Sequence, residues 1–354
     1  MSDDHLPSTM SGWLLTGHGG PERLSWRTDL VVPRPGVGEV LIRVHATSVN
    51  NTDINTRVGW YSKSVRGGTE GAQTQSEDGG WAGALTFPRI QGADLVGRIV
   101  AVGPRVAAAR IGERVVCRAM YPPPDAGPFD LMTRGSERDG AFAEYATAEA
   151  QHALTVTDAS QPDEVLGILP CAYSTAEGML DRVGLDAERV LVTGASGGVG
   201  LAAVQLAKLR GADVTAMAGR DKHGAVVAAG AETVLGRDDP LPPEMDVVVD
   251  LVGGPRWPDM VAALRRGGRY VTSGAIAGPI VELDLRDLYL RDLTFFGSTY
   301  QRDHIMPTVL DHVQSGRLRP LIAERFTLAD LPKAQAAFEA KTHVGKIAIE
   351  VHMP

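Results

Sequence analysis

Three glycines at three-residue spacing could hold a phosphate group in this chain. Residues 190–200 read VLVTGASGGVG, and the following LAAVQLAK is typical of a helix. Without Cβ atoms, the backbone N–H groups can approach a pyrophosphate, and a helix N-terminus adds unpaired donors and a positive dipole. A strand, a glycine turn and a helix in this order predict a dinucleotide-binding loop. Its expected residues are Gly194, Ser196, Gly197, Gly198, Val199 and Gly200.

The end of the next predicted strand bears on which dinucleotide is bound. An NAD-binding unit usually places an acidic residue there, against the ribose 2′-hydroxyl. Here Gly219 takes that position, and Arg220 and Lys222 follow it. A guanidinium fork and an ammonium both suit a 2′-phosphate, so we expect NADPH. The alternative is a pair of solvated charges at a helix start, and Asp221 leaves the register open by one or two residues.

A third strand end completes the predicted ligand side of the sheet. Ser273 and Gly274 follow the strand expected at residues 269–273. Ligands of open α/β sheets bind outside the carboxyl ends of the strands. We therefore expect both residues to contact the cofactor.

Composition narrows the class of protein. The chain has 354 residues, of which 44% are hydrophobic and 22% charged, which suits two globular domains. A net charge of −8 predicts no nucleic-acid partner and no attraction to an anionic membrane. No apolar stretch approaches the roughly 20 residues of a membrane span, and the first residues do not read as a secretory signal. Cys117 and Cys171 cannot form a disulfide framework, so we expect a cytoplasmic enzyme.

Two patterns of secondary structure follow one another along the chain. Before about residue 155, short β-runs at 39–45, 95–102 and 113–117 are separated by Gly and Pro. Strands and helices then alternate, which predicts a parallel sheet with right-handed crossovers. The expected strands are 189–193, 213–217, 245–250 and 269–273, and the expected helices are 198–210, 222–229 and 257–265. After two further helices (303–315 and 330–341), we expect a closing strand at 345–351 to return to the first domain.

Residues 62–85 show neither helical nor strand periodicity and are mostly polar. Loops of this length inside a compact domain are uncommon. The segment is either a surface insertion or a lid over a substrate.

The order of these pieces resembles that of the medium-chain dehydrogenase/reductase superfamily. The similar segments, besides the glycine loop, are 92–103, 112–115, 140–145, 169–176, 246–254, 267–274 and 345–347. The resemblance implies an α/β fold: a Rossmann doubly wound parallel sheet (residues 156–302) inserted in a β-rich GroES-like catalytic domain (residues 1–155 plus 303–354). It also implies cofactor contacts from Thr175 and Lys346, although Lys346 has a plain surface lysine as its alternative. A homodimer joined through edge strands of the nucleotide sheet is implied as well.

Zinc alcohol dehydrogenases of this superfamily carry metal ligands that this chain lacks. Their cysteine ligand corresponds to Asn50 and their histidine ligand to Ala93, while Cys171 stands where the third ligand would be. A catalytic zinc site needs three protein ligands and an open position. We therefore expect no metal, with Cys171 as a small buried residue. The alternative is a metal-dependent alcohol dehydrogenase that uses Cys171 and Asp94.

Residues 50–61, NNTDINTRVGWY, resemble a segment of the zinc-free quinone oxidoreductases such as zeta-crystallin and of the 2-enoyl thioester reductases. In those reductases the tyrosine matching Tyr61 is the proposed proton donor to the substrate α-carbon. A phenol suits this task because it is neutral at pH 7 and can donate a proton. Asn50 would orient substrate or nicotinamide, and Asp53 would bond local backbone donors. The alternatives are a tyrosine that only lines the pocket and an asparagine that only forms a turn.

Together these features predict an NADPH-dependent, zinc-free oxidoreductase that adds hydride to an activated C=C bond or a quinone. The acceptor would be a small conjugated molecule: an enone, an enoyl thioester or a quinone. The negative charge that hydride addition creates in such acceptors delocalises into the conjugated carbonyl. Hydrogen-bond donors and a proton are then enough for the reduction, and no Lewis acid is needed. The remaining alternatives are a zinc-dependent alcohol dehydrogenase and a non-catalytic NADPH-binding protein.

Overall fold

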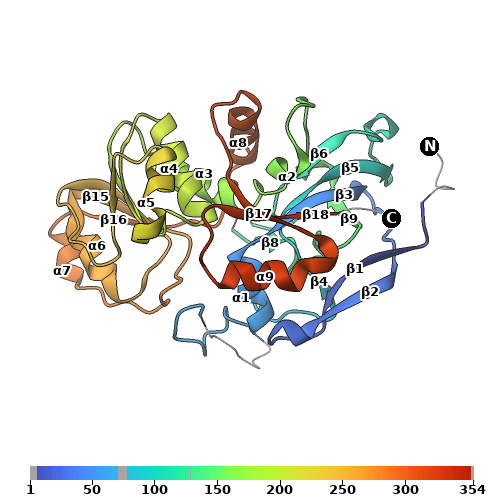
Figure 1. Ribbon diagram of the computed structural model, residues 1–354, viewed down its shortest axis with the longest axis horizontal. Helices are drawn as coiled ribbons and strands as arrows, with labels where there is room; N and C mark the ends of the chain where they lie inside the picture. The colour runs from blue at the N-terminus through green and yellow to red at the C-terminus, as the bar shows by residue number, and fades with distance from the viewer. Residues whose placement is uncertain (1–5, 71–77, 124, 128, 352–354) are drawn as a thin grey trace.

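Two lobes lie side by side along the long axis of the molecule (Figure 1). The computed structural model describes residues 6–70, 78–123, 125–127 and 129–351. The first part of the chain and its C-terminal part build a β-rich lobe, and the middle part builds an α/β lobe.

The central sheet of the β-rich lobe has seven strands in its described residues. Its order is β10-β6-β5-β3-β18-β17, with β9 also paired to β3. The strands are β3 (Glu39–Val49), β5 (Leu95–Val102), β6 (Arg114–Cys117), β9 (Tyr145–Glu149), β10 (Ala153–Thr155), β17 (Ile322–Thr327) and β18 (Lys346–Glu350). Because β18 runs antiparallel beside β3, with Ile347 opposite Val49, the predicted return of the closing strand is confirmed.

Smaller elements surround this sheet. The strands β1 (Thr9–Leu15), β2 (Leu24–Val31) and β4 (Arg89–Ile90) form one sheet, and β7 (Met120–Tyr121) pairs with β8 (Met132–Thr133). The helices of this lobe are α1 (Asn51–Val58), α2 (Asp163–Leu166) and α9 (Leu331–Glu339). In Figure 1, α9 lies beside α1.

The sheet of the α/β lobe is entirely parallel, as predicted. Its order is β13-β12-β11-β14-β15-β16. The strands are β11 (Arg189–Val192), β12 (Asp213–Met217), β13 (Thr233–Leu235), β14 (Met245–Asp250), β15 (Leu264–Thr272) and β16 (Thr294–Gly297). The helices are α3 (Ala172–Val183), α4 (Gly198–Leu209), α5 (His223–Ala228), α6 (Trp257–Ala263), α7 (Leu285–Tyr289) and α8 (Ile305–Gln314).

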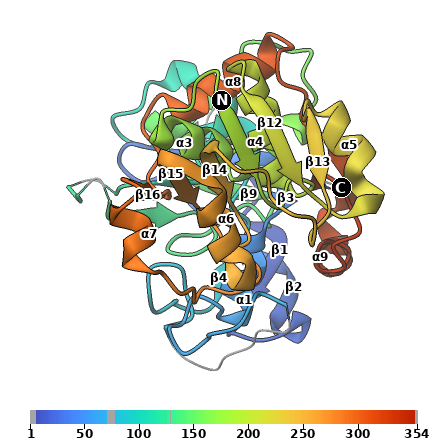
Figure 2. The same cartoon turned by 90° about the vertical axis from the view of Figure 1, so that its left-hand side faces the viewer.

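Alternating side chains of the central strand fill two cores, one on each face of the sheet. Val190 and Val192 pack with residues of α3 and α4, whereas Leu191 packs with residues of α6 on the other face. Figure 2 shows helices on both sides of these strands. The fold is therefore a doubly wound Rossmann-type sheet joined to a GroES-like lobe.

Two helices near the predicted domain boundaries contact the other lobe. The sequence places α8 (Ile305–Gln314) in the catalytic domain, and its Met306 and Val309 pack in a core that holds α3 as well as strands of the β-rich lobe. The sequence places α2 (Asp163–Leu166) in the nucleotide domain, and this helix packs against β3 and β18. Both segments lie near predicted boundaries, and periodicity gives no information about which lobe a helix covers.

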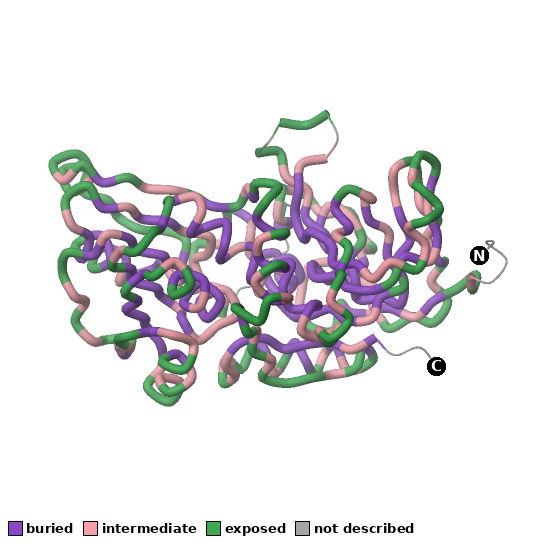
Figure 3. The backbone as a smooth tube through the Cα atoms, turned by 90° about the horizontal axis from the view of Figure 1, so that it is seen from above, coloured by how far each residue is buried: buried purple, intermediate pink, exposed green. Residues whose placement is uncertain are grey.

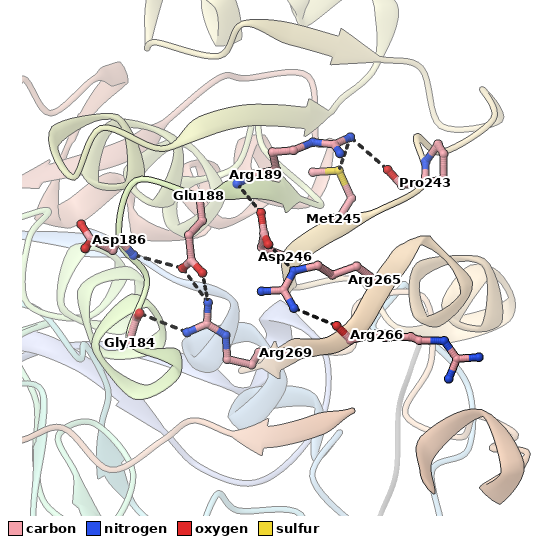
Figure 4. A network of polar contacts seen from close by, with 10 residues as sticks. All are labelled: Gly184, Asp186, Glu188, Arg189, Pro243, Met245, Asp246, Arg265, Arg266 and Arg269. Atoms are coloured by element: carbon pink, nitrogen blue, oxygen red, sulfur yellow. Dashed lines mark hydrogen bonds and ion pairs between the residues drawn. The ribbon is translucent and has the colours of Figure 1, made fainter. Parts of the chain in front are cut away.

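Charged residues tie together the amino ends of the parallel strands (Figure 4). Arg269 pairs with Glu188 at 2.5 Å, and the backbone N–H of Arg189 donates to Asp246 at 2.9 Å. Arg265 pairs with the same Asp246. The opposite, carboxyl ends of the strands face the β-rich lobe. The glycine loop follows β11 at this end.

Buried residues run through the centres of both lobes, and exposed residues gather on the outer loops (Figure 3). Within the described ranges, no helix is long and apolar enough to cross a membrane.

Candidate active site

The glycine loop has the geometry that a dinucleotide requires. Gly194 adopts φ +58°, and a Cβ atom on Gly200 would lie 2.2 Å from the Gly194 carbonyl oxygen, so only glycine fits there. The helix α4 begins at Gly198, and its Leu201 N–H donates to the Gly197 carbonyl at 2.8 Å. The N–H groups that precede Leu201 in the first turn have no partner within the helix, and they suit the phosphates of a dinucleotide.

The side chain of Lys346 packs against this loop. The backbone N–H of Gly345 donates to the Ser196 carbonyl at 3.0 Å, and a Cβ atom on Gly198 would meet the Lys346 side chain at 2.5 Å. Only 2% of Lys346 is exposed, so the surface-lysine alternative is wrong. Its ammonium donates to the Val49 carbonyl at 2.9 Å and to Asn50 Oδ1.

Asp94 connects its own segment of the chain with three others, at residues 48–50, 171 and 346. Its Oδ2 accepts from Asn50 Nδ2 at 2.8 Å and from the Ser48 hydroxyl, and it lies 3.6 Å from Lys346 Nζ. Its Oδ1 accepts from the Cys171 backbone N–H at 2.7 Å. Both Asp94 and Lys346 are buried, and a buried carboxylate persists when such partners surround it. The sequence suggested Asp94 only as a metal ligand, because its partners are distant along the chain.

Two positions that correspond to zinc ligands of the alcohol dehydrogenases, Ala93 and Cys171, are close together here. Ala93, Ala119 and Cys171 pack as a small buried cluster, and Cys171 is a free thiol, as expected. Burial, with the negative charge of Asp94 nearby, raises the pKa of the Cys171 thiol. No group of three or more His, Cys, Asp or Glu side chains in the described part of the chain could hold a metal ion.

Tyr61 reaches this region through a chain reversal after α1. The helix ends at Gly59 in the left-handed conformation (φ 76°), and the Tyr61 hydroxyl then donates to Thr52 Oγ1 at 3.2 Å. Burial raises the pKa of Tyr61 to about 12, and the contacts with Thr52 and Asn55 oppose that rise. Cys171 and Asp53 act on this pKa in the same direction as burial. The phenol therefore stays protonated at neutral pH.

Asp53 anchors the start of α1. Its Oδ2 accepts from the backbone N–H of Asn50 at 2.8 Å, which confirms the predicted bond to a local donor. Burial raises the pKa of Asp53 to about 7, Asp94 adds to that rise, and the Asn50 N–H opposes it. Asp53 thus holds Asn50 at the helix start while sharing its surroundings with a second carboxylate.

The two cations predicted for a 2′-phosphate differ in their surroundings. Arg220 has a side chain that is 75% exposed and that pairs with Asp239 at 2.6 Å. Lys222 is partly buried and donates to the backbone carbonyls of Lys341 and His343. Beside them, the Asp221 carboxylate folds toward Gly219, at 2.8 Å from where a Cβ atom would be.

The other predicted cofactor residues lie on elements that face the same region. Thr175 is one turn into α3, where its N–H donates to the Cys171 carbonyl at 3.1 Å. Ser273 and Gly274 directly follow β15, at the carboxyl end of the sheet. The Gly274 carbonyl accepts from Thr272 Oγ1 at 3.0 Å.

Part of the irregular segment crosses from one lobe to the other. We call residues 62–70 the strap; residues 71–77 of the predicted insertion lie outside the described residues. Within the strap, the Thr69 N–H donates to the Ile276 carbonyl at 2.9 Å, and Trp60 Nε1 donates to the Gly67 carbonyl at 3.2 Å. The strap therefore connects Trp60 and Tyr61 with the loop that follows Ser273 and Gly274.

Comparison with known proteins identifies relatives along the whole chain. Residues 36–158 match the alcohol dehydrogenase GroES-like domain, and residues 222–349 match the zinc-binding dehydrogenase domain. The chain is 26% identical to acryloyl-coenzyme A reductase of Sulfurisphaera tokodaii, over 94% of this chain and 98% of that protein. It is 30% identical to quinone oxidoreductase of Lama guanicoe, over 94% of each. The structure of a candidate alcohol dehydrogenase from Sinorhizobium meliloti 1021 is similar with TM-score 0.89, at 42% identity over 98% of each chain.

The two matching domains occur in the order that the fold displays, and the 30% identity extends over nearly the entire chain. The glycine loop fits the nicotinamide dinucleotide that such proteins bind. This chain belongs to the medium-chain dehydrogenase/reductase superfamily of nicotinamide-dependent oxidoreductases.

Proposed function

We propose that this protein reduces an activated C=C bond or a quinone, with a small conjugated molecule as the acceptor. The observation that carries the proposal is the phenol of Tyr61, which a hydrogen bond to Thr52 holds against α1 and which stays protonated at neutral pH because burial raises its pKa. The bound nicotinamide supplies the hydride. A proton donor is then the remaining requirement for reduction of a conjugated bond, and Tyr61 meets it.

Relatives support this choice. One is named an acryloyl-coenzyme A reductase and another a quinone oxidoreductase, so both names describe acceptors with conjugated systems. In this chain Asn50 has both ends of its amide engaged, by Lys346 and by Asp94. The amide nitrogen also contacts the Ser48 carbonyl at 3.5 Å. We propose that Asn50, held in this fixed orientation, helps to orient substrate or nicotinamide.

We propose that catalysis uses no zinc. Asn50 and Ala93 stand where zinc enzymes of the family have ligands, and the Lys346 ammonium already lies beside Asp94 and Asn50. A divalent cation at the same place would face the charge of that ammonium. Stoichiometric zinc in protein purified without chelators would contradict this proposal.

We propose NADPH as the cofactor, since Arg220 is exposed at the end of β12 and no acidic residue stands at 219. The substitution Arg220→Ala should weaken NADPH binding about tenfold or more and leave NADH binding unchanged, because only NADPH carries the 2′-phosphate. Arg286→Ala is the matched control, since Arg286 is also exposed and paired with an aspartate. Equal effects on both dinucleotides would show that Arg220 does not recognise the 2′-phosphate.

We further propose a cytoplasmic homodimer with no nucleic-acid or membrane partner. Large apolar side chains are exposed around α7, next to the sheet-edge strand β16. They are Ile280, Leu285, Tyr289 and Leu290, each more than half exposed. A second copy of the chain would cover them.

The direct test is oxidation of NADPH in the presence of enones, enoyl-coenzyme A thioesters, alkenals and quinones. We expect turnover with at least one of these acceptors and a loss of about a hundredfold or more in kcat for Tyr61→Phe. Absence of turnover with every conjugated acceptor would exclude the proposal.

An alcohol dehydrogenase is the second candidate, favoured by the 42% identity to the Sinorhizobium meliloti structure. Oxidation of primary and secondary alcohols with NADP⁺ or NAD⁺, together with metal analysis, separates the two. Tight NADPH binding without turnover of either acceptors or alcohols would favour a non-catalytic binding protein.

A further inference from the structure

Thr52 and Asn55 form a polar face of α1 against which the Tyr61 hydroxyl rests. Residues three apart on a helix are neighbours on its surface. The Tyr61 hydroxyl donates to Thr52 Oγ1 at 3.2 Å, and the nearby Asn55 side chain lowers the pKa of the phenol. One helical turn therefore supplies two polar side chains that act on the phenol.

Backbone hydrogen bonds after the end of α1 place Tyr61 on this face. Gly59 adopts φ 76° at the end of α1, a conformation that favours glycine. The Trp60 N–H then donates to the Asn55 carbonyl at 2.8 Å, and the Ser62 N–H to the Gly59 carbonyl at 3.2 Å. Tyr61 lies between these two bonds, so its side chain returns to the helix it has just left.

The side chain of Asn55 is the second polar group that acts on the phenol. Asn55 is only 6% exposed, and its Oδ1 has no hydrogen-bond partner among the residues that the structure describes. Its contact lowers the pKa of Tyr61, as does the contact with Thr52, so both favour the phenolate form. The groups that oppose them are Cys171 and Asp53, together with burial.

We propose that Thr52 and Asn55 are positioning residues for Tyr61, and that Thr52 returns a proton to it in each turnover. This inference rests on the proposed reduction of a conjugated double bond, with the reduced nicotinamide as reductant. Hydride addition at the β-carbon shifts the π electrons to form an enolate, and its α-carbon takes the Tyr61 proton. The phenolate oxygen takes the Thr52 proton while Thr52 takes a proton from water in the same step, and the hydroxide that forms is neutralised by bulk solvent, so that solvent supplies the net proton. Thr52 can exchange with water because it is only partly buried.

The hydrogen bond is tested without any turnover. Tyrosine labelled with ¹³C at Cζ reports hydrogen bonding of the phenol by NMR, and Tyr61→Phe assigns the signal. We expect Thr52→Val to shift the Tyr61 signal and Thr52→Ser to preserve it. Thr56→Val, one turn further along α1, should leave the signal in place. An unmoved signal in folded Thr52→Val protein overturns the proposal.

The relay is tested with an acceptor that the wild-type enzyme reduces. Thr52→Val and Asn55→Leu should each lower kcat about tenfold, with KM changed less than about twofold. Thr52→Val should also increase the solvent deuterium isotope effect, because reprotonation becomes slow, and Thr52→Ser should restore both values. Wild-type kcat and isotope effect in Thr52→Val would overturn the relay. If the wild type reduces no conjugated acceptor, the proposed function fails, and the NMR shift alone decides whether Thr52 holds Tyr61.

Discussion

At the scale of single residues, the most unusual feature is a buried ammonium shared by two buried carboxylates. Lys346 lies 3.6 Å from Asp94, and its charge also reaches Asp53. Taking charges out of water is costly, and their mutual attraction offsets that cost only with well-placed partners. The hydrogen bonds of Ser48 and Asn50 to Asp94 are such partners.

Replacement of Lys346 by an uncharged residue should therefore lower the stability of the folded protein strongly. For Lys346→Met we expect the free energy of unfolding to fall by about 3–5 kcal/mol, because Asp94 is left without its counter-charge. The double variant Lys346→Met/Asp94→Asn should recover part of this loss, measured by urea unfolding. Lys333→Met is the control: Lys333 is 77% exposed and pairs with Asp330, so its loss should cost less than about 1 kcal/mol. Equal effects of the two lysine substitutions would contradict a structural role for the buried charge.

Asp53 should make stability depend on pH. Its pKa is raised by burial from an ordinary 3.8 to about 7, so the folded state holds the proton more tightly than the unfolded state. The Asp53 contribution is therefore fully present below pH 4 and is lost as the pH rises toward 7. Asp53→Asn keeps an acceptor for the Asn50 N–H and removes this loss.

We expect the stability of Asp53→Asn relative to wild type to increase between pH 4 and 7 and to stay level above that. The full shift corresponds to at most about 4 kcal/mol. Parallel pH profiles of unfolding for the two proteins would show that Asp53 does not titrate in this range.

At the scale of elements, α1 and the strap position the residues that the chemistry needs. The helix carries Thr52 and Asn55, its C-terminal glycine turns Tyr61 back onto it, and the strap then crosses to the loop after β15. The strap directly follows Tyr61 in the chain. A displacement of the strap would therefore move the backbone of Tyr61 through only a few residues.

Two adjacent glycines of the strap provide a test of its contact with the nucleotide lobe and a matched control. A Cβ atom on Gly68 would lie 2.6 Å from the Ile276 carbonyl oxygen, whereas one on Gly67 would have nothing within 4 Å. We expect Gly68→Ala to push the strap from the nucleotide lobe and to speed hydrogen exchange of the Thr69 amide about tenfold or more, since its bond to Ile276 would be lost. Gly67→Ala should leave that amide protected. Equal protection in both variants would mean that the strap contact is not stable in solution.

At the scale of the whole molecule, the proposed homodimer would cover the exposed apolar side chains around α7. Grouped apolar surface marks an interaction site more often than isolated apolar residues do. Leu285 and Tyr289 are 64% and 62% exposed on the same short helix.

The variant Leu285→Lys/Tyr289→Lys should be monomeric where the wild type is dimeric, because two lysines per copy would have to be buried. Sedimentation velocity measures the mass directly. Val31→Lys is the control, since Val31 is 77% exposed but lies at the end of β2 in the other lobe. A wild-type protein that sediments as a monomer would exclude the dimer.

Local patterns in the sequence were enough for much of the fold. Apart from β13, the sequence predicts the strands and helices from β11 to β15 to within a few residues, except that β15 begins at 264 instead of 269. The short strands β13 and β16 were not predicted, because three or four residues give too little periodicity. The glycine loop and the segment that carries Tyr61 were recognised because their residues are close neighbours along the chain.

What the sequence determined by itself was the kind of chemistry: a phosphate-binding turn, a phenol in a family motif, and the loss of metal ligands at Asn50 and Ala93. Only the tertiary structure decided that Lys346 is buried between Asn50 and Asp94 and that the strap reaches Ile276. The contact of Lys346 with Asn50 joins residues 296 positions apart. It depends on the register of β18 beside β3, and no local pattern of residue types encodes the pairing of strands so distant in the chain.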